Sequence, residues 1–145
     1  MAESDVKPFL IKEKIQDMMK YGKKALQHFP WRERELADKI SEVMYRMLEL
    51  AIRVEKKFYK KTTLQDLDIT IDLLRHLLRV ASEQDYYNEL VPKRGRGGRV
   101  VKGPDGSAIM VRVQPPLPLR KYEYWSRLVD EIGRMVGGYI KTARQ

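Results

Sequence analysis

The side chains best suited to bind a ligand in this sequence form a short basic cluster that contains no acid. Its members are Lys93, Arg94, Arg96, Arg99 and Lys102. Guanidinium groups match the geometry of phosphate oxygens, and the interleaved glycines leave the backbone free to follow an anionic chain. Tyr86 and Tyr87 precede the cluster, where they could stack on bases. The pattern favours anion binding over a flexible loop that only aids solubility, because such loops more often mix charges of both signs.

A second set of basic residues lies on segments with helical periodicity. It consists of Arg75, Arg79, Arg127, Arg134 and Lys141. Steps of four and seven residues place each group along one side of a helix, where it could follow phosphates. Asp72 can pair with Arg75, and Asp130 or Glu131 can pair with Arg127 or Arg134. Phosphate binding and an ordinary solvated face therefore remain equally open for these residues.

A third basic pattern is largely neutralised by its own acids. A basic residue stands at every seventh position from Arg32 through Lys39, Arg46 and Arg53 to Lys60. Glutamates precede three of these residues by four positions, which is the favourable order for an ion pair within a helix. Each such pair contributes only about 0.3–0.5 kcal/mol when exposed, but it cancels the local charge. We expect this helix to bind phosphate less well than the other two sets.

The residues that catalysis would need are scarce. There is no cysteine, and the two histidines, His28 and His76, stand apart beside a helix break and among leucines. No glycine-rich phosphate loop, no set of metal ligands at a recognised spacing and no activated nucleophile is present in the sequence. The sequence therefore predicts a binding protein that is not an enzyme and has neither a metal nor another cofactor.

The size and charge of the chain fit that prediction. Its 145 residues make one domain, residues 1–145, with 43% hydrophobic residues to form a core and a net charge of +9. Residues 1–85 carry 17 basic and 15 acidic side chains, whereas residues 86–145 carry 12 and 5. A localised excess of this kind favours an anionic partner. The acidic start and the lack of a long apolar run predict a cytoplasmic protein that is not in a membrane.

Four segments with apolar residues at steps of three and four must position these cations. The predicted helices cover residues 8–27, 30–59, 62–84 and 119–142. Pro30 is expected to open the second helix, whose apolar stripe ends at Phe58, and Thr62 or Thr63 to cap the third. Because the first two connections are short, neighbouring helices should be antiparallel. The expected fold is all-α, an up-and-down four-helix bundle.

Residues 86–118, between the third and fourth helices, have no helical period. Residues 99–102 and 108–113 resemble short strands, and Pro104, Asp105 and Gly106 between them form a strong turn signal. We expect a basic β-hairpin inserted into the bundle, followed by a stiff proline-rich spacer at residues 115–118.

Three glycines inside the fourth helix suggest close packing. Gly133, Gly137 and Gly138 each cost about 1 kcal/mol relative to alanine in a helix, so we expect a neighbouring backbone to approach them closely. Trp125 and Tyr139 lie on the apolar stripe of the same helix. The neighbour could belong to the same chain or to another subunit, and several wide apolar stripes favour oligomerisation.

Two stretches give the sequence a family resemblance. Residues 73–79, LLRHLLR, and residues 122–141, YEYWSRLVDEIGRMVGGYIK, closely resemble the accessory variability determinant (Avd) of diversity-generating retroelements. The break at Phe29 and Pro30 before a long second helix is similar too. Avd belongs to a four-helix-bundle family that includes proteins encoded in intervening sequences of large-subunit ribosomal RNA. Residues 86–118 depart from the family, whose members join these two helices by a short link.

The resemblance implies a function as well as a fold. It implies a homopentamer with a basic surface that binds RNA and DNA, associates with the reverse transcriptase of the retroelement and has no catalytic residues of its own. The five helical cations match basic positions of the family pattern. The alternative is a structural oligomeric adaptor that binds protein partners without touching nucleic acid.

Overall fold

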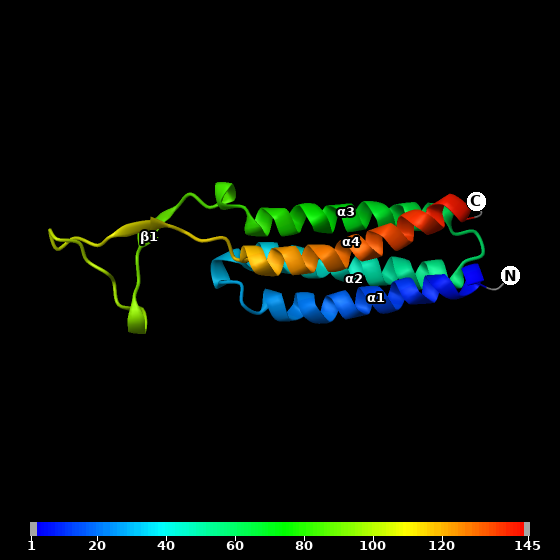
Figure 1. The fold of residues 1–145 in the computed structure, drawn as a ribbon, viewed down its shortest axis with the longest axis horizontal. Coiled ribbons are helices and arrows are strands. Elements are labelled where there is room, and N and C mark those ends of the chain that lie inside the picture. The colour runs from blue at the N-terminus through cyan, green and yellow to red at the C-terminus, as the bar shows by residue number, and fades with distance from the viewer. Residues whose placement is uncertain (1–2, 144–145) are drawn as a thin grey trace.

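Four long helices run up and down along one axis. The computed structural model describes residues 3–143, with side chains from residue 10 onward. The helices are α1 (Glu3–Leu26), α2 (Arg34–Lys56), α3 (Lys61–Ser82) and α4 (Leu119–Thr142). Both ends of the described chain lie at one end of the bundle, and a slender arm projects from the other (Figure 1). The structure confirms the predicted bundle, and it confirms both ends of the fourth helix.

The core lies between the four apolar stripes. Each helix packs against two neighbours, α1 against α2 and α4, and α3 against α2 and α4. Side chains that are at most 1% exposed come from all four helices and include Ile11, Ile15, Met18, Ile40, Met44, Met47, Leu67, Ile71, Leu74, Trp125, Val129 and Ile132. Burying one such large side chain contributes about 1.5–3 kcal/mol, so the stripes drive formation of the bundle.

Trp125 is the largest side chain of this core. Its indole Nε1 donates to the Sδ atom of Met18 at 3.2 Å, and its ring meets the edge of Tyr21 at 6.1 Å between centroids. Gly22 makes the space, because a Cβ atom there would lie 2.6 Å from Cζ2 of Trp125. Trp125 therefore joins α4 to α1 within one chain, which is the helix-packing role predicted for it.

The connections between helices differ in detail from the sequence prediction. Residues 31–33 form a separate 3-10 turn (Trp31–Glu33), so Pro30 caps this turn and does not begin α2. Helix α2 ends at Lys56 because Lys57 is already extended, and Phe58, predicted to continue the stripe, is 68% exposed. The predicted threonine caps of α3 are wrong. The helix begins at Lys61, and Thr63 is buried inside its first turn.

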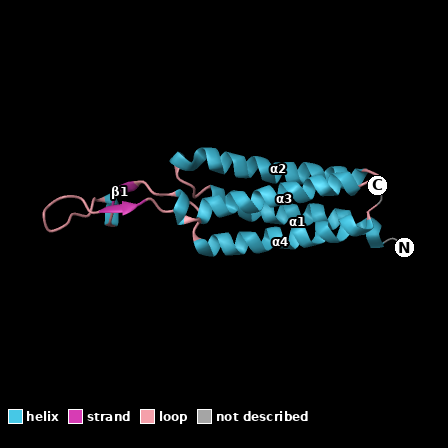
Figure 2. Cartoon of the chain, turned by 90° about the horizontal axis from the view of Figure 1, so that it is seen from above, coloured by secondary structure: helices cyan, strands magenta, loops and turns pink. Residues whose placement is uncertain are grey.

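The arm, residues 86–118, is the expected insertion, but its strands pair differently. Strand β1 (Leu90–Pro92) is antiparallel to β2 (Met110–Arg112), with Val91 opposite Val111. The predicted strand at residues 99–102 is wrong; this segment makes only single bridges, from Val100 to Arg94 and from Lys102 to Ala108. Segment 108–113 contains β2, as predicted in part, and the arm lies beyond the bundle in two perpendicular views (Figures 1 and 2).

Two tight turns give the arm two tips. In the first, the amide of Gly95 donates to the carbonyl of Arg99 at 2.7 Å, and Gly97 and Gly98 adopt positive φ angles. In the second, the predicted turn, the amide of Gly103 donates to the carbonyl of Ser107 at 2.8 Å. The first reversal places residues 93–94 beside 100–101. This additional reversal explains why β2 pairs with β1 instead of with residues 99–102.

The base of the arm is fixed to the bundle. The Gln84 side chain donates to the carbonyls of Tyr87 and Val113, each at 2.8 Å, which holds together the two chain segments that enter and leave the arm. The amide of Leu117 donates to the carbonyl of Ala81 at 3.0 Å, and the Leu117 side chain is 1% exposed. Pro118 then stands in an extended conformation directly before α4. The arm is therefore anchored at its base and projects outward from there.

Candidate nucleic-acid interface

The five cations of the basic cluster all lie on the arm, and all are exposed. Among the described residues, no ion pair involves Lys93, Arg94, Arg96, Arg99 or Lys102. Arg94 donates through Nη1 to the carbonyl of Gly98 at 2.9 Å, which braces the first tip. The structure therefore brings the predicted cluster together on one projecting element, with its charges directed to solvent.

The acid nearest to this cluster in sequence, Asp105, is occupied within its own turn. The carboxylate of Asp105 accepts hydrogen bonds from Oγ of Ser107 at 2.7 Å and from its amide at 3.0 Å. The hydrogen bond from the Ser107 hydroxyl is the main reason why the pKa of Asp105 lies below its usual value. This carboxylate closes the second tip and does not pair with the arm cations.

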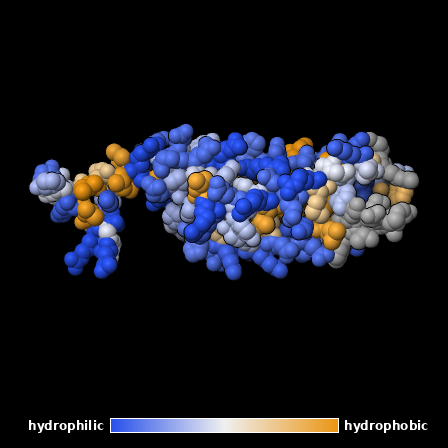
Figure 3. All heavy atoms as spheres, viewed as in Figure 1, coloured by the Kyte–Doolittle hydropathy of each residue, from blue (hydrophilic) through white to orange (hydrophobic). Residues whose placement is uncertain are grey.

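Apolar side chains accompany the cations on the arm. Leu90 is 58% exposed and Met110 is 49% exposed, although both belong to the paired strands. Figure 3 shows apolar residues along the arm beside hydrophilic ones. A two-stranded sheet has no second layer to cover it here, so the arm offers both charge and apolar surface to a partner.

The arginines of α3 are in a different situation, because carboxylates hold them. The Arg75 guanidinium pairs with Asp72 of its own helix at 3.2 Å and with Asp130 of α4 at 3.0 Å. Arg79 pairs with Glu83 at 3.6 Å. A polar pocket of about 270 Å³ surrounds these groups between α3 and α4, and it contains as many carboxylates as arginines. Arg75 therefore links α3 to α4, and an anionic ligand would have to compete with its two ion pairs.

Gly133 accommodates Arg75. A Cβ atom at Gly133 would overlap the Arg75 guanidinium, so the prediction that a backbone approaches this glycine is wrong. A Cβ atom at Gly137 or Gly138 would meet no described atom within 4 Å. For these two glycines, packing against a second subunit stays a prediction. Tyr139 packs against the core from a partly buried position on α4.

Because Asp130 pairs with Arg75, it does not neutralise the cations of α4, which are exposed. Glu131, the other expected partner, pairs with Lys14 of α1 at 3.2 Å. Arg127 lies over the Tyr124 ring at 5.8 Å, and no ion pair is recorded for Arg127, Arg134 or Lys141 within residues 10–143. On α2, acids three residues later neutralise two of the five heptad cations: Lys39 pairs with Glu42 and Arg46 with Glu49. No ion pair is recorded for Arg32, Arg53 or Lys60 within residues 10–143.

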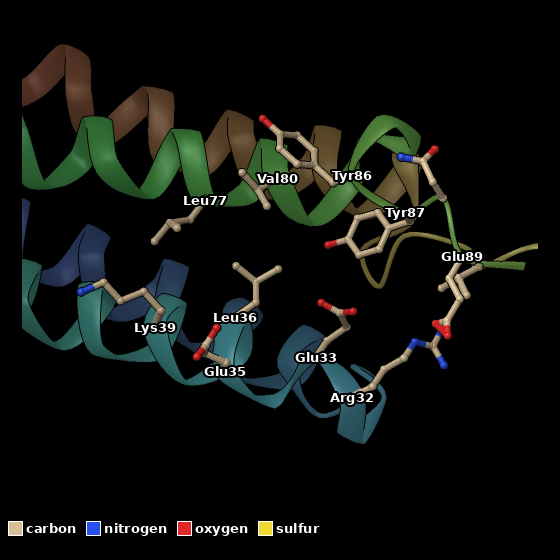
Figure 4. A pocket seen from close by; sticks show the side chains of 12 residues that line it. Arg32, Glu33, Glu35, Leu36, Lys39, Leu77, Val80, Tyr86, Tyr87 and Glu89 are labelled. Carbon is tan, nitrogen blue, oxygen red and sulfur yellow. The ribbon is translucent and has the colours of Figure 1, made fainter.

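A pocket of about 680 Å³ lies where the base of the arm meets α2 and α3. Leu36, Leu77 and Val80 form its apolar floor, and charged residues of both signs line its rim (Figure 4). Tyr87 is 8% exposed and helps to line this pocket, so its ring is not available to stack on a base; Tyr86 is 57% exposed. Burial, followed by the charge of Glu33, raises the pKa of Tyr87 to about 12.

Sequence reasoning missed one basic group, the turn between α2 and α3. Lys56, Lys57, Lys60 and Lys61 flank the exposed rings of Phe58 and Tyr59. The stretch KKFYKK carries this signal, but the helical period places Phe58 on the apolar stripe and Lys60 in the heptad pattern. Both rings are exposed because α2 ends at Lys56, before it reaches them.

Two further findings concern metal binding and membrane crossing. Within the part of the chain that the structure describes, no three His, Cys, Asp or Glu side chains gather in a group that could hold a metal ion. None of the described helices combines the length and the apolar character needed to cross a bilayer.

The fold and its basic surface define a helical-bundle protein with an added arm, and a family comparison identifies the bundle. A profile of the bAvd-like family matches residues 9–94, which include most of α1, all of α2 and α3, and β1. The chain belongs to this family, which confirms the resemblance to Avd proteins and indicates an accessory role in a diversity-generating retroelement. Residues 122–141 lie outside the match, beyond the arm. No curated protein matches the chain.

Proposed function

We propose that this protein is a non-catalytic accessory subunit of a diversity-generating retroelement that binds template RNA and its complementary DNA. Family membership supports the accessory role. The observation that carries nucleic-acid binding is the arm, where five exposed cations face no carboxylate among the described residues. Arg127, Arg134 and Lys141 extend the basic surface along α4, whereas Arg75 and Arg79 make a smaller contribution because they are already paired.

Phosphate contacts set the expected strength and its dependence on salt. Each phosphate neutralised on a single strand contributes about −0.7 to the slope of log affinity against log salt. Five arm contacts would therefore give a slope of about −3.5. Guanidinium groups that are free of carboxylates release the counterions of the nucleic acid without first breaking an ion pair.

The subunit acts in the cytoplasm as a homo-oligomer, which we propose to be a pentamer, and it associates with the reverse transcriptase. Exposed apolar side chains on the outer face of the bundle support oligomerisation, among them Ile52 at 42% and Ile69 at 68% exposure. Gly137 and Gly138 leave a shallow strip on α4 that a neighbouring helix can approach.

A second candidate function is a structural adaptor that binds only proteins. The exposed apolar residues of β1 and β2 favour it, because phosphate binding does not need them. In that case the arm would contact the reverse transcriptase and not the RNA.

Titration of the full-length protein with template RNA and with an unstructured oligonucleotide, at low and at physiological salt, tests the proposal. We expect affinity to fall steeply with salt for both ligands. Affinity that stays constant with salt would refute the electrostatic mechanism. Absence of RNA binding together with co-purification of the reverse transcriptase would favour the adaptor.

A further inference from the structure

An exposed tryptophan stands at the end of the bundle from which the arm projects. Trp31 begins the 3-10 turn between α1 and α2. The two residues that follow it, Arg32 and Glu33, line the same pocket as Glu89 at the base of the arm. The Arg32 side chain extends toward Glu89 (Figure 4). Trp31 therefore lies beside the base of the arm, at the end of the bundle away from the ends of the described chain (Figure 1).

One face of the Trp31 ring is covered and the other is open. The guanidinium carbon of Arg34 lies 4.1 Å from the ring centroid, so this cation rests on the ring. With Arg34 in place, Trp31 is still 77% exposed, whereas Trp125 in the core is 0% exposed. A ring covered on both faces would not keep so much exposure. The second face of Trp31 is therefore open to solvent.

The chain fixes both parts of this pair before any ligand binds. Pro30 is extended, with φ −68° and ψ 157°, and its carbonyl accepts a hydrogen bond from the amide of Glu33 at 2.9 Å. On the other side, Nε of Arg34 lies 3.6 Å from the carboxylate of Asp38. Because the turn and the guanidinium are already placed, a ligand that stacks on Trp31 has less ordering to impose.

We propose that Trp31, supported by Arg34, is a stacking platform for an unpaired base of a nucleic-acid strand whose phosphates bind the arm. Every base has a flat π-face, so stacking requires no particular sequence. A base inside a duplex already has neighbours on both faces, so the platform selects single strands. The proposal rests on the proposed nucleic-acid function. It adds the class of ligand and a contact outside the basic residues.

A protein is the other partner that an exposed tryptophan can bind. Tryptophans that contribute strongly to protein interfaces lie inside a rim of contacts that excludes water. The four residues after Trp31 are all charged, from Arg32 to Glu35. Such surroundings stay hydrated, whereas stacking needs only one face of the ring. The exposed cations of the neighbouring arm also suit an anionic ligand, so these features favour the nucleic acid.

Intrinsic fluorescence of the full-length protein tests the platform directly. The chain has two tryptophans, and only Trp31 is exposed to a quencher in solution. Emission that acrylamide quenches therefore comes from Trp31. The Trp31→Leu variant provides the reference emission of Trp125. The titrants are a twelve-nucleotide oligouridylate and an RNA duplex of the same length.

Three full-length variants separate the ring from its apolar bulk. Trp31→Leu keeps an apolar side chain but removes the π-face, and Trp31→Tyr keeps a ring. Leu119→Ser is the matched control, because Leu119 is 67% exposed at the start of α4, at the same end of the bundle, and has no ring. Circular dichroism confirms that each variant is helical.

We expect the oligouridylate to quench the emission of Trp31 and to shield it from acrylamide, whereas the duplex binds the arm with little change in emission. Trp31→Leu should bind the oligouridylate about tenfold more weakly, because one stacked base is lost. Its affinity for the duplex should change less than twofold. Trp31→Tyr should retain most of the affinity, and Leu119→Ser should bind both RNAs like the wild type.

Four results would overturn the proposal. Acrylamide that fails to quench Trp31 in the free protein would place this ring in a subunit contact. Normal binding of the single strand by Trp31→Leu would leave the proposed function without this platform. Equal losses of single strand and duplex would exclude stacking. Loss of co-purification with the reverse transcriptase, with unchanged RNA affinity, would assign Trp31 to a protein contact. Failure of the wild type to bind either RNA would refute the proposed function itself.

Discussion

The arm and the helical face of α3 carry similar arginines in opposite situations. On α3, Arg75 is held by Asp72 and Asp130, so its charge contributes to joining two helices. On the arm, Arg96 and Arg99 face solvent with no carboxylate recorded near them in the described structure. The comparison teaches that the number of basic residues in a segment does not measure its capacity for phosphate. What matters is whether the fold has already supplied a counter-charge.

The largest expected effect comes from reversing charge on the arm. Arg96→Glu with Arg99→Glu should lower the affinity for single-stranded RNA more than tenfold and reduce the salt slope by about 1.4, because two phosphate contacts are lost. The matched control is Lys39→Glu with Arg46→Glu, which makes the same change in net charge on the paired face of α2. Filter binding over a range of salt measures both. Equal losses in the two variants would show that only net charge matters.

A smaller effect is expected when the roles of Arg75 and Arg134 in stability and in RNA binding are compared. Arg75→Met should lower the free energy of unfolding by about 1 kcal/mol, because two partly exposed ion pairs are lost. Its RNA affinity should change less than twofold. Arg134→Met should do the reverse, leaving stability unchanged and weakening RNA binding. Urea unfolding and RNA titration of both variants provide the check, and RNA affinity that falls more for Arg75→Met would contradict the assignment.

The glycines of α4 give a third test. Gly137→Ala should raise the free energy of unfolding by up to about 1 kcal/mol, since alanine favours the helix and its methyl group meets no described atom within 4 Å. Gly133→Ala should gain less, because the methyl group displaces the Arg75 guanidinium. Thermal unfolding measures both variants. Equal stabilisation would show that Arg75 does not depend on Gly133, and a smaller oligomer with Gly137→Ala would locate a subunit contact.

The smallest expected effect concerns the anchored base of the arm. Tyr87 has a pKa of about 12, against 10.0 for an ordinary tyrosine. The unfolded chain therefore loses this proton first as the pH rises above 10, and the free energy of unfolding falls between pH 10 and 12. Tyr87→Phe should remove this part of the fall. Urea unfolding at pH 9 and pH 11 measures it, and an identical loss in both proteins would indicate that Tyr87 is solvated.

The sequence predicts the bundle well because its helices are long and strongly periodic. The limits of α4, Leu119 and Thr142, follow from the proline before it and the continuous apolar stripe. The arm is harder to predict, since a three-residue strand such as β1 has no measurable period. The turn at Gly103–Ser107 was predictable because proline, aspartate and glycine act locally.

Predicting the site from sequence fails where partners are distant along the chain. Asp130 lies 55 positions from Arg75, so no helical spacing rule could assign this ion pair or show that it releases Arg127 and Arg134. The position of Gly133 against a side chain, and not a backbone, depends on the same contact. The basic cluster of the arm was predictable because the absence of acids is a local property of residues 93–102.

Lysine acetylation, with and without bound RNA, tests the central claim most directly. Lys93 and Lys102 on the arm and Lys39 on α2 are all exposed, but only Lys39 has a recorded carboxylate partner within the described chain. We predict that template RNA slows acetylation of Lys93 and Lys102 several-fold at low salt while Lys39 changes less than twofold. Protection of Lys39 with no protection of the arm lysines would contradict the account.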